Sequence, residues 1–254
     1  MTKIISIINH KGGVGKTTIT ANLGSALARK GYSVLLVDFD PQANLSSHFG
    51  IEEEESTIAD ATITGETIWA VEAEKGLRLL PGSLRLSDAE SHFAGKISQY
   101  TRLKKVLKSH AKDYDFVLVD CPPSLGFFTL NALTASTHII TPCEASKMAS
   151  DGLGSIIQLV DDVKEDMNER LENLGVVISN RENRVVEKDF EAMIRDEYDT
   201  FESVITRRKH VKEASARQVS VFEYAPECVS VNEFSDLASE LAGKLEMKKT
   251  ESHV

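Results

Sequence analysis

Runs of consecutive apolar residues alternate along the chain with stretches in which apolar residues recur every three or four positions. The consecutive runs are rich in Val, Ile and Leu, as expected for strands that are buried on both faces of a sheet. Helical stretches between such strands are typical of a parallel sheet with helices on both sides. The predicted strands are Ile4–Ile8, Val34–Asp38, Leu77–Pro81, Phe116–Asp120, His138–Thr141 and Val176–Ser179.

The periodic stretches also predict the first and last helices. The first is expected from about Lys16 to Lys30, where Gly31 ends it, and the last is expected to begin near Asn232. We therefore predict an α/β fold, a doubly wound and mostly parallel sheet flanked by helices. The length of the chain suits one domain, so residues 1–254 are expected to form a single domain.

Composition narrows the class of protein. Hydrophobic residues make up 41% and charged residues 27% of the chain, which is typical of a globular protein and not of a disordered one. Apolar runs fall short of the roughly 18 residues of a membrane span, and the N-terminal apolar stretch is too short for a signal peptide. The three cysteines are far apart and lack CxxC spacing, which indicates reduced cytoplasmic thiols rather than a disulfide or metal site. They are Cys121, Cys143 and Cys228.

A glycine-rich loop between the first predicted strand and helix carries the strongest chemical signal. Its glycines let backbone N–H groups converge on an anion, and the helix N-terminus adds a positive dipole end. Lys16 is expected to reach the terminal phosphates, and the Thr17 hydroxyl is expected to ligate Mg²⁺. His10 stands where the pattern G-x-x-x-x-G-K-[ST] has its first glycine. The nucleotide-binding loop is Lys11-Gly12-Gly13-Val14-Gly15-Lys16-Thr17-Thr18.

Three aspartates end two of the predicted strands. Asp38 and Asp40 are two residues apart, so both side chains are expected to face the phosphate site. Asp120 follows four apolar residues, the Walker B pattern in which the carboxylate holds Mg²⁺ through water. Ligands bind outside the carboxyl ends of parallel strands, which is where these residues are predicted to lie. A helix cap is the alternative role for each aspartate taken singly.

The loop pattern K-G-G-x-G-K-T and the pattern D-x-D-P-Q, which begins at Asp38, resemble the deviant Walker A family. That family contains the ParA and Soj partition ATPases, MinD and the nitrogenase iron protein. The resemblance implies that Lys11 reaches across a dimer interface to the partner's nucleotide. It further implies that Asp38 supports the Mg²⁺ region and that Asp40 positions or activates the attacking water, so that Lys11, Lys16 and Asp40 are catalytic. The pair Cys143-Glu144 also resembles a C-E pair of the family.

Two segments resemble the family's base-binding elements. Asn180 matches a position from which related proteins contact adenine, although a turn-forming Asn is the alternative. Residues 204–215 resemble the Soj pattern I-P-R-x-x-x-x-x-E-A-P, with Thr206 and Ser215 in place of its prolines. Arg207 matches the family's arginine and is expected to bind nucleotide.

A basic segment stands out on a chain with a net charge of −10. Between Thr206 and Gln218, five Lys/Arg residues accompany one acid, Glu213. Aromatic residues are not interleaved, so phosphate contacts to double-stranded DNA are favoured over base stacking on single strands. An ordinary solvated helix face is the alternative. The predicted DNA-binding residues are Arg207, Arg208, Lys209, Lys212 and Arg217.

The resemblance implies a cytoplasmic, nucleoid-associated partition ATPase that uses ATP and Mg²⁺. Residues 1–254 would then form a single P-loop ATPase domain, without the N-terminal helix-turn-helix region of some ParA proteins. ATP would close a homodimer, the dimer would bind double-stranded DNA non-specifically, and a ParB-like centromere-binding protein would stimulate slow hydrolysis and release. The alternatives are a ParA-like ATPase that positions a carboxysome or chemoreceptor cluster, a MinD-like membrane ATPase and a metabolic synthetase similar to dethiobiotin synthetase. The last ten residues carry two lysines but almost no apolar face, so no membrane binding is expected.

Overall fold

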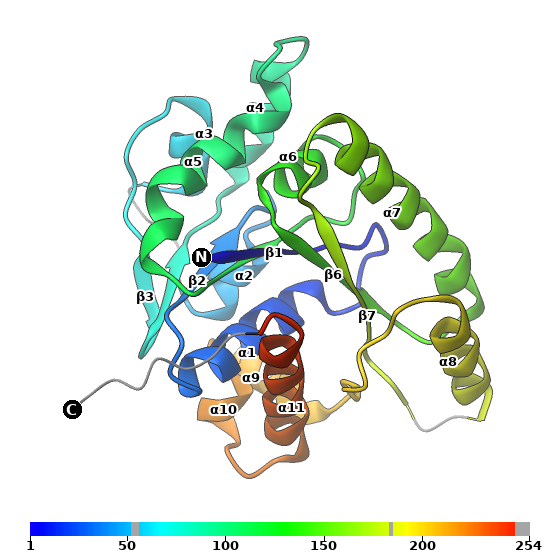
Figure 1. Cartoon of the computed structure of the whole chain (residues 1–254). Helices are drawn as coiled ribbons and strands as arrows, with labels where there is room; N and C mark the ends of the chain where they lie inside the picture. The colour runs from blue at the N-terminus through cyan, green and yellow to red at the C-terminus, as the bar shows by residue number, and fades with distance from the viewer. Residues whose placement is uncertain (52–55, 183–184, 247–254) are drawn as a thin grey trace.

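Seven strands form one sheet in the order β3-β4-β2-β5-β1-β6-β7. Every neighbouring pair is parallel except β3 and β4, which are antiparallel. The computed structural model describes residues 1–51, 56–182 and 185–246. The doubly wound α/β fold predicted from the sequence is thereby confirmed (Figure 1). The strands are β1 Lys3–Ile7, β2 Val34–Asp38, β3 Val71–Glu74, β4 Leu77–Leu80, β5 Phe116–Asp120, β6 His138–Cys143 and β7 Glu172–Ile178.

Helices cover both faces of the sheet. In Figure 1, α1, α9, α10 and α11 lie together on one face, and α3 to α7 lie on the other. The α-helices are α1 Lys16–Arg29, α2 Asn44–His48, α3 Ile58–Ile63, α4 Ser87–Phe93, α5 Arg102–His110, α6 Phe127–Ala135, α7 Lys147–Asp166, α8 Val185–Glu197, α9 Lys209–Ala216, α10 Val221–Tyr224 and α11 Val229–Lys244. Three short 3-10 helices are η1 Leu84–Leu86, η2 Gln99–Thr101 and η3 Ala111–Asp113.

Each face of the sheet has its own hydrophobic core. Along β2, Val34 and Leu36 belong to the core under α1 and α11, whereas Leu35 and Val37 belong to the core under α3 to α6. Successive strand residues point to opposite faces, so a strand with helices on both sides must be apolar at every position. This double burial explains why the central strands were recognisable as continuous apolar runs.

The predicted and observed boundaries agree best at the centre of the sheet. β2 and β5 have the predicted bounds, and α1 ends one residue before the predicted Lys30. The prediction missed β3, because this short antiparallel edge strand is only partly buried. It also began β7 four residues too late, because Glu172 and Asn173 are exposed and polar, although they pair with β6. The last helix starts at Val229, three residues before the predicted position.

Parallel pairing brings the ends of three strands together at one edge. Asp120 at the end of β5 is in register with Ile7 of β1 on one side and with Asp38 of β2 on the other. The candidate site is built on this edge. None of the helices in the described ranges combines the length and apolar character needed to cross a bilayer. The C-terminal residues 247–254, to which most of the membrane prediction refers, lie outside the described residues.

Candidate functional site

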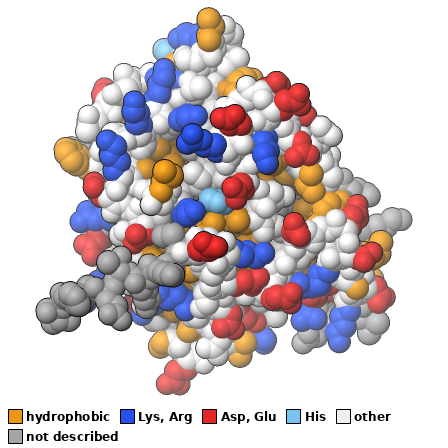
Figure 2. All heavy atoms as spheres, viewed as in Figure 1, with side chains coloured by type: hydrophobic (Ala, Val, Ile, Leu, Met, Phe, Trp, Pro, Cys, Tyr) orange, Lys and Arg blue, Asp and Glu red, His pale blue; other side chains and the backbone are white. Residues whose placement is uncertain are grey.

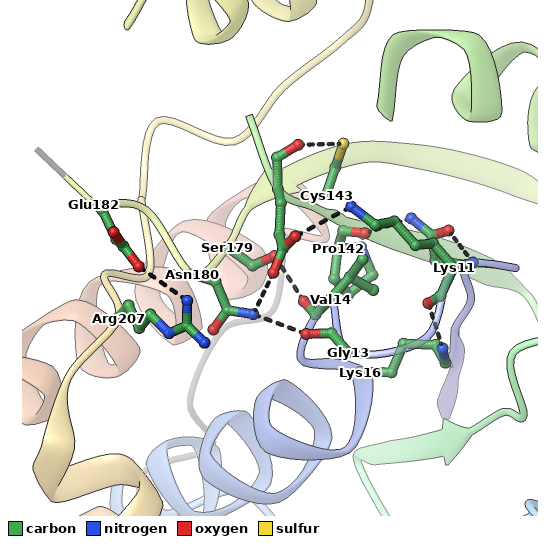
Figure 3. Close-up of polar contacts among 12 residues, drawn as sticks. Lys11, Gly13, Val14, Lys16, Pro142, Cys143, Ser179, Asn180, Glu182 and Arg207 are labelled. Carbon is green, nitrogen blue, oxygen red and sulfur yellow. Dashed lines mark hydrogen bonds and ion pairs between the residues drawn. The ribbon is translucent and has the colours of Figure 1, made fainter. Parts of the chain in front are cut away.

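The glycine-rich loop leaves β1 and turns directly into α1. Gly15 precedes the helix with a φ of 87°, and Gly13 has a φ of 79°. Side chains other than glycine rarely adopt this left-handed backbone, so both glycines are required by the turn. Val14 is buried, and its carbonyl oxygen accepts a hydrogen bond from the Ser179 hydroxyl at 2.7 Å (Figure 3). The loop is therefore held against the end of β7, with the N–H groups of the first turn of α1 at its opening.

A cavity of about 410 Å³ lies over this loop at the carboxyl edge of the sheet. Six of the eight predicted loop residues line it, but Lys11 and Val14 do not. A cavity of this size with backbone N–H groups at its floor is suited to a phosphate chain. Its lining residues are Gly12, Gly13, Gly15, Lys16, Thr17, Thr18, Asp40, Asn44, Ser47, His48, Pro123 and Ser215.

Lys16 places a positive charge in this cavity. The residue is only 7% exposed, and its Nζ donates a hydrogen bond to the Lys11 carbonyl oxygen at 3.2 Å. Burial lowers the pKa of Lys16, while the charges of Asp120 and Asp40 act in the opposite direction. An ammonium group has three N–H donors, so it can hold the loop and a phosphate oxygen at the same time.

The ends of β2 and β5 bring buried carboxylates together. Thr17 Oγ1 donates to Asp120 Oδ2 at 2.6 Å, which joins the loop to β5. Burial, together with the neighbouring Asp38, raises the pKa of Asp120 to about 8. Burial likewise raises the pKa of Asp38 to about 6. Acids whose charged form is disfavoured in this way are stabilised by a nearby cation.

Only one of the two aspartates in D-x-D-P-Q borders the cavity. Asp40 lines it, and its Oδ1 accepts a hydrogen bond from the Gln42 amide at 2.9 Å. Asp38 is buried beside α2, where its Oδ2 accepts from the Ser46 amide and hydroxyl at 2.8 and 2.7 Å. Strand β2 ends at Asp38, so the two-residue alternation does not extend to Asp40. The Mg²⁺-supporting role of Asp38 stays a prediction.

The donor set fits Mg²⁺ bound together with a nucleotide. Mg²⁺ is usually held by one or two carboxylates and by substrate phosphates, and it retains several waters. Thr17 and Asp120 supply a hydroxyl and a carboxylate beside the loop, and the buried Asp38 Oδ1 has no hydrogen-bond partner among the described residues. Groups of three or more His, Cys, Asp or Glu side chains with metal-binding geometry do not occur in the described part of the chain. Phosphate oxygens would therefore complete the site.

Lys11 lies on the other side of the loop, where Glu144 binds it. Its Nζ is 3.2 Å from Glu144 Oε2, and both side chains are about one-third exposed. Asn180 Nδ2 donates to Glu144 Oε1 and to the Gly13 carbonyl oxygen, each at 2.9 Å (Figure 3). Glu144 therefore joins the loop lysine to the predicted base-binding residue. The sequence pattern had identified Glu144 only as part of a resemblance, without a role.

A second cavity of about 300 Å³ adjoins the loop and contains the predicted base-binding residues. Asn180 and Arg207 both border it, although they are far apart in sequence. Asn180 also has a φ of 50°, so it forms a turn as well as bordering the cavity. Arg207 Nη1 forms an ion pair with Glu182 Oε1 at 2.9 Å (Figure 3). The cavity is lined by Gly13, Gly15, Thr18, Asn180, Ile205, Thr206, Arg207, Arg208, Val211, Lys212 and Ser215.

The predicted DNA-binding segment forms the start of α9 and its two flanks. All five of its Lys/Arg residues are exposed. Three of them, Arg207, Arg208 and Lys212, border the second cavity, whereas Lys209 and Arg217 do not. This segment therefore lies next to the nucleotide site and is not a separate surface.

Helix α2 contributes to the site in a way that the sequence pattern did not predict. This short helix follows D-x-D-P-Q directly and places Asn44, Ser47 and His48 along the first cavity. Burial lowers the pKa of His48 to about 4, against the effect of a hydrogen bond to the Val219 backbone. His48 thus connects α2 with the chain that follows α9. The only available sequence signal was its closeness to Asp40.

Comparisons with known sequences agree with this geometry. A family model described as an AAA domain matches residues 2–173. The sporulation initiation inhibitor protein Soj of Bacillus subtilis is 36% identical over 252 residues, which cover 95% of this chain and 99% of that protein. The chromosome partitioning protein ParA of Caulobacter vibrioides is 34% identical over 255 residues, 95% of this chain and 94% of its own length.

Solved structures show the same fold. Cobyrinic acid a,c-diamide synthase from Mycobacterium smegmatis, with bound ADP and magnesium, superposes with a TM-score of 0.85 at 28% identity. The comparison covers 98% of this chain and 97% of that one. The cell division ATPase MinD of Pyrococcus furiosus gives a TM-score of 0.82 at 25% identity, over 96% of this chain and all of its own.

Proposed function

This chain belongs to the ParA/Soj family of P-loop ATPases, and we propose that it is a DNA-partition ATPase. ATP binding closes two copies of the chain face to face, and the dimer binds double-stranded DNA without sequence preference. Hydrolysis is slow, and a ParB-like centromere-binding protein accelerates it and so releases the DNA. The Soj and ParA relatives, aligned over at least 94% of their own lengths, support this proposal.

The observation that carries the ATPase function is the convergence of four side chains at one edge of the sheet. Lys16, Thr17 and Asp40 line the cavity over the phosphate loop, and the buried Asp120 accepts a hydrogen bond from Thr17. Lys16 neutralises charge on the terminal phosphates, and Asp40, held by the Gln42 amide, orients the attacking water. Burial raises the pKa of Asp40, which brings this carboxylate closer to the range of an effective general base. Mg²⁺, held by Thr17 and Asp120, would neutralise phosphate charge when bound.

Lys11 is proposed to act on the partner's nucleotide. Its present partner within the same chain is Glu144, and an ion pair this exposed contributes about 0–1 kcal/mol. Such a contact is easily exchanged for the phosphates of a second nucleotide when the dimer closes. The Lys11 ammonium then supplies charge in trans, as an arginine finger does.

The test combines oligomeric state with DNA retention. Four proteins are tested in the presence of ATP, of ADP and without nucleotide: wild type, Lys11→Ala, Lys16→Ala and Asp40→Ala. Light scattering measures their oligomeric state, and a binding assay measures their retention on non-specific duplex DNA. We expect wild type and Asp40→Ala to dimerise and bind duplex with ATP, and the two lysine variants to do neither. An Asp40→Ala chain that stays monomeric when saturated with ATP contradicts the proposal.

A metabolic synthetase is the second candidate, favoured by the likeness to the cobyrinic acid a,c-diamide synthase structure. In that function, ATP would activate a small carboxylate at the same loop. Turnover that depends on a small-molecule acid and is unaffected by DNA and a ParB-like protein would favour it. The similar coverage of the Soj and ParA sequences at higher identity favours partition.

A further inference from the structure

A second basic surface lies on α5, on the face of the sheet opposite α9. Residues 91–112 contain six Lys/Arg residues and no Asp or Glu, although the whole chain has a net charge of −10. Leu103, Val106 and Leu107 bury one side of α5 in the core that α3 to α6 share. The α9 segment packs with the other core, through Ala214. The two basic regions are thus separated by the sheet.

The outer side of α5 presents lysines without ion-pair partners. Lys105, Lys108 and Lys112 are exposed, and among the described residues none of them has a carboxylate oxygen within 4 Å. Their spacing of three and then four residues places them on one side of the helix and its extension. Figure 2 shows Lys and Arg side chains gathered over α4 and α5, at the upper left of the view. We call these three lysines the α5 face.

Two other cations of α5 are not counted in the α5 face, because other groups of the chain already lie close to them. Lys104 shares a surface hollow with Glu165, Asp166 and Glu169 at the end of α7. Arg102 donates to the Thr62 carbonyl oxygen at 3.1 and 3.2 Å and lies over the Phe93 ring. The three lysines of the α5 face have no comparable contacts among the described residues, apart from Glu66 in the hollow that Lys105 borders.

The cations of the α9 segment differ in their contacts. Arg207 is paired with Glu182, and Arg208 Nε donates to the Thr206 hydroxyl at 2.8 Å. Both border the cavity expected to hold the base. Part of their charge is therefore used within the nucleotide site. The α5 face lines neither cavity, and its charge is available to an external anion.

We propose that the α5 face binds the phosphate backbone of double-stranded DNA, as a second contact surface besides the α9 segment. This inference rests on the proposed function. Lysine ammonium groups are compact, strongly hydrated charges that neutralise phosphates without the planar geometry that favours base recognition. Because the chain as a whole is acidic, a local cluster of this kind attracts a phosphate backbone to its own side of the protein.

The test is the salt dependence of duplex retention in the presence of ATP. The variant is Lys105→Gln, Lys108→Gln and Lys112→Gln together. Each phosphate contact contributes about 0.9 to the slope of log affinity against log salt, so we expect the slope to become shallower by roughly 3. If the two proteins bind equally at 1 M salt, this change in slope corresponds at 0.1 M salt to a loss of affinity of about 500-fold. Basal ATPase activity should be unchanged.

The matched control removes three exposed lysines that lie next to acids in sequence. Lys75, Lys164 and Lys188 follow or precede Glu74, Glu165, Glu187 and Asp189, so their replacement by Gln gives the same change in net charge. We expect the control to keep the wild-type salt slope. An equal loss in the control would overturn the proposal, because net charge would then explain the effect. Should the triple variant misfold, Lys108→Gln alone is expected to change the slope by about 1.

Trp69 provides an independent readout. It is the single tryptophan of the sequence, its side chain is 79% exposed, and the carbonyl oxygen of the preceding Ile68 lies 3.0 Å from His110 Nε2 on α5. We expect duplex to change its fluorescence in wild type and in the control, but not in the α5 variant.

The failures of the two proposals are distinguishable. If the α5 variant keeps the wild-type slope while replacement of Arg207, Arg208 and Lys209 abolishes retention, the α5 proposal is wrong and the partition function stands. If wild type shows no ATP-dependent retention, the partition function fails first. If polyglutamate binds more tightly than duplex with the same dependence on α5, the surface binds an acidic protein instead.

Discussion

The two basic regions of this chain look alike in sequence and differ in structure. The segment around α9 and the α5 face each concentrate exposed cations on an acidic protein. Around α9, Arg207 and Arg208 form polar contacts within the chain and border a cavity next to the phosphate loop. On α5, the lysines extend from a helix on the opposite face of the sheet. The contacts that the cations make within the chain, more than the number of cations, therefore indicate what a basic segment does.

The largest expected effect comes from Asp40→Ala, which separates DNA binding from hydrolysis. Loss of a group that orients the attacking water should lower the hydrolysis rate by roughly 10²–10⁴-fold. ATP should still bind, so duplex retention should persist and the salt slope due to the α5 face should be unchanged. Phosphate release and retention are measured on the same sample. A normal rate of hydrolysis would remove Asp40 from the mechanism.

Lys16→Ala should weaken ATP binding. Its direct effect is therefore expected at the nucleotide site, which lies next to the α9 segment. Charge-assisted hydrogen bonds contribute about 1.5–3 kcal/mol, so ATP affinity should fall by about 10- to 150-fold. Titration calorimetry with an ATP analogue measures this loss. The matched control is Lys30→Ala, a half-buried lysine just beyond the end of α1, which should bind ATP normally. Unchanged affinity in Lys16→Ala would contradict the assignment of the cavity.

The burial of His48, on the α9 side of the molecule, predicts that the free energy of unfolding depends on pH. The pKa of His48 is about 4 in the folded chain, below the ordinary value of 6.5, because of burial. Between these values the unfolded chain binds a proton that the folded chain does not. The contribution of neutral His48 to the free energy of unfolding is therefore fully present above pH 6.5. It falls as the pH drops toward 4, by at most about 1.4 kcal/mol per pH unit.

Denaturant titrations at pH 7, 6 and 5 measure this change in the free energy of unfolding. His48→Asn should have a smaller loss of stability between pH 7 and 5 than wild type. The control is His92→Asn on α4, an exposed histidine on the α5 side, which should keep the wild-type dependence. Identical pH dependence in wild type and His48→Asn would rule out this role for His48.

The smallest expected effect distinguishes the two basic regions directly. Arg207→Gln should weaken ATP binding by several-fold, since the guanidinium is exposed and paired at the edge of the base cavity. Lys105→Gln on α5 should leave ATP affinity unchanged and reduce only the salt slope of DNA binding. Equal effects of both variants on ATP affinity would remove the distinction drawn between the two regions.

The strands that are buried most completely were predicted best from the sequence. β2 and β5 were predicted with the correct bounds because helices cover both of their faces, so that every residue in them is apolar or functional. β3 was missed because pairing with β4 stabilises it at the sheet edge, and its own sequence, Val-Glu-Ala-Glu, gives no such pattern. The late start predicted for β7 has the same cause.

The sequence alone determined the fold class and the phosphate loop. The backbone freedom of glycine, the start of a helix and the continuous apolar run of a buried strand are all local properties of the sequence. It also placed Asp40 and Asp120 after strands, and parallel pairing then brought them to one edge. Only the tertiary structure decided that Glu144 holds Lys11 and Asn180, that Asp38 turns toward Ser46, and which cations remain without ion pairs. These features depend on side chains brought within a few ångströms by folding, and no local pattern encodes that distance.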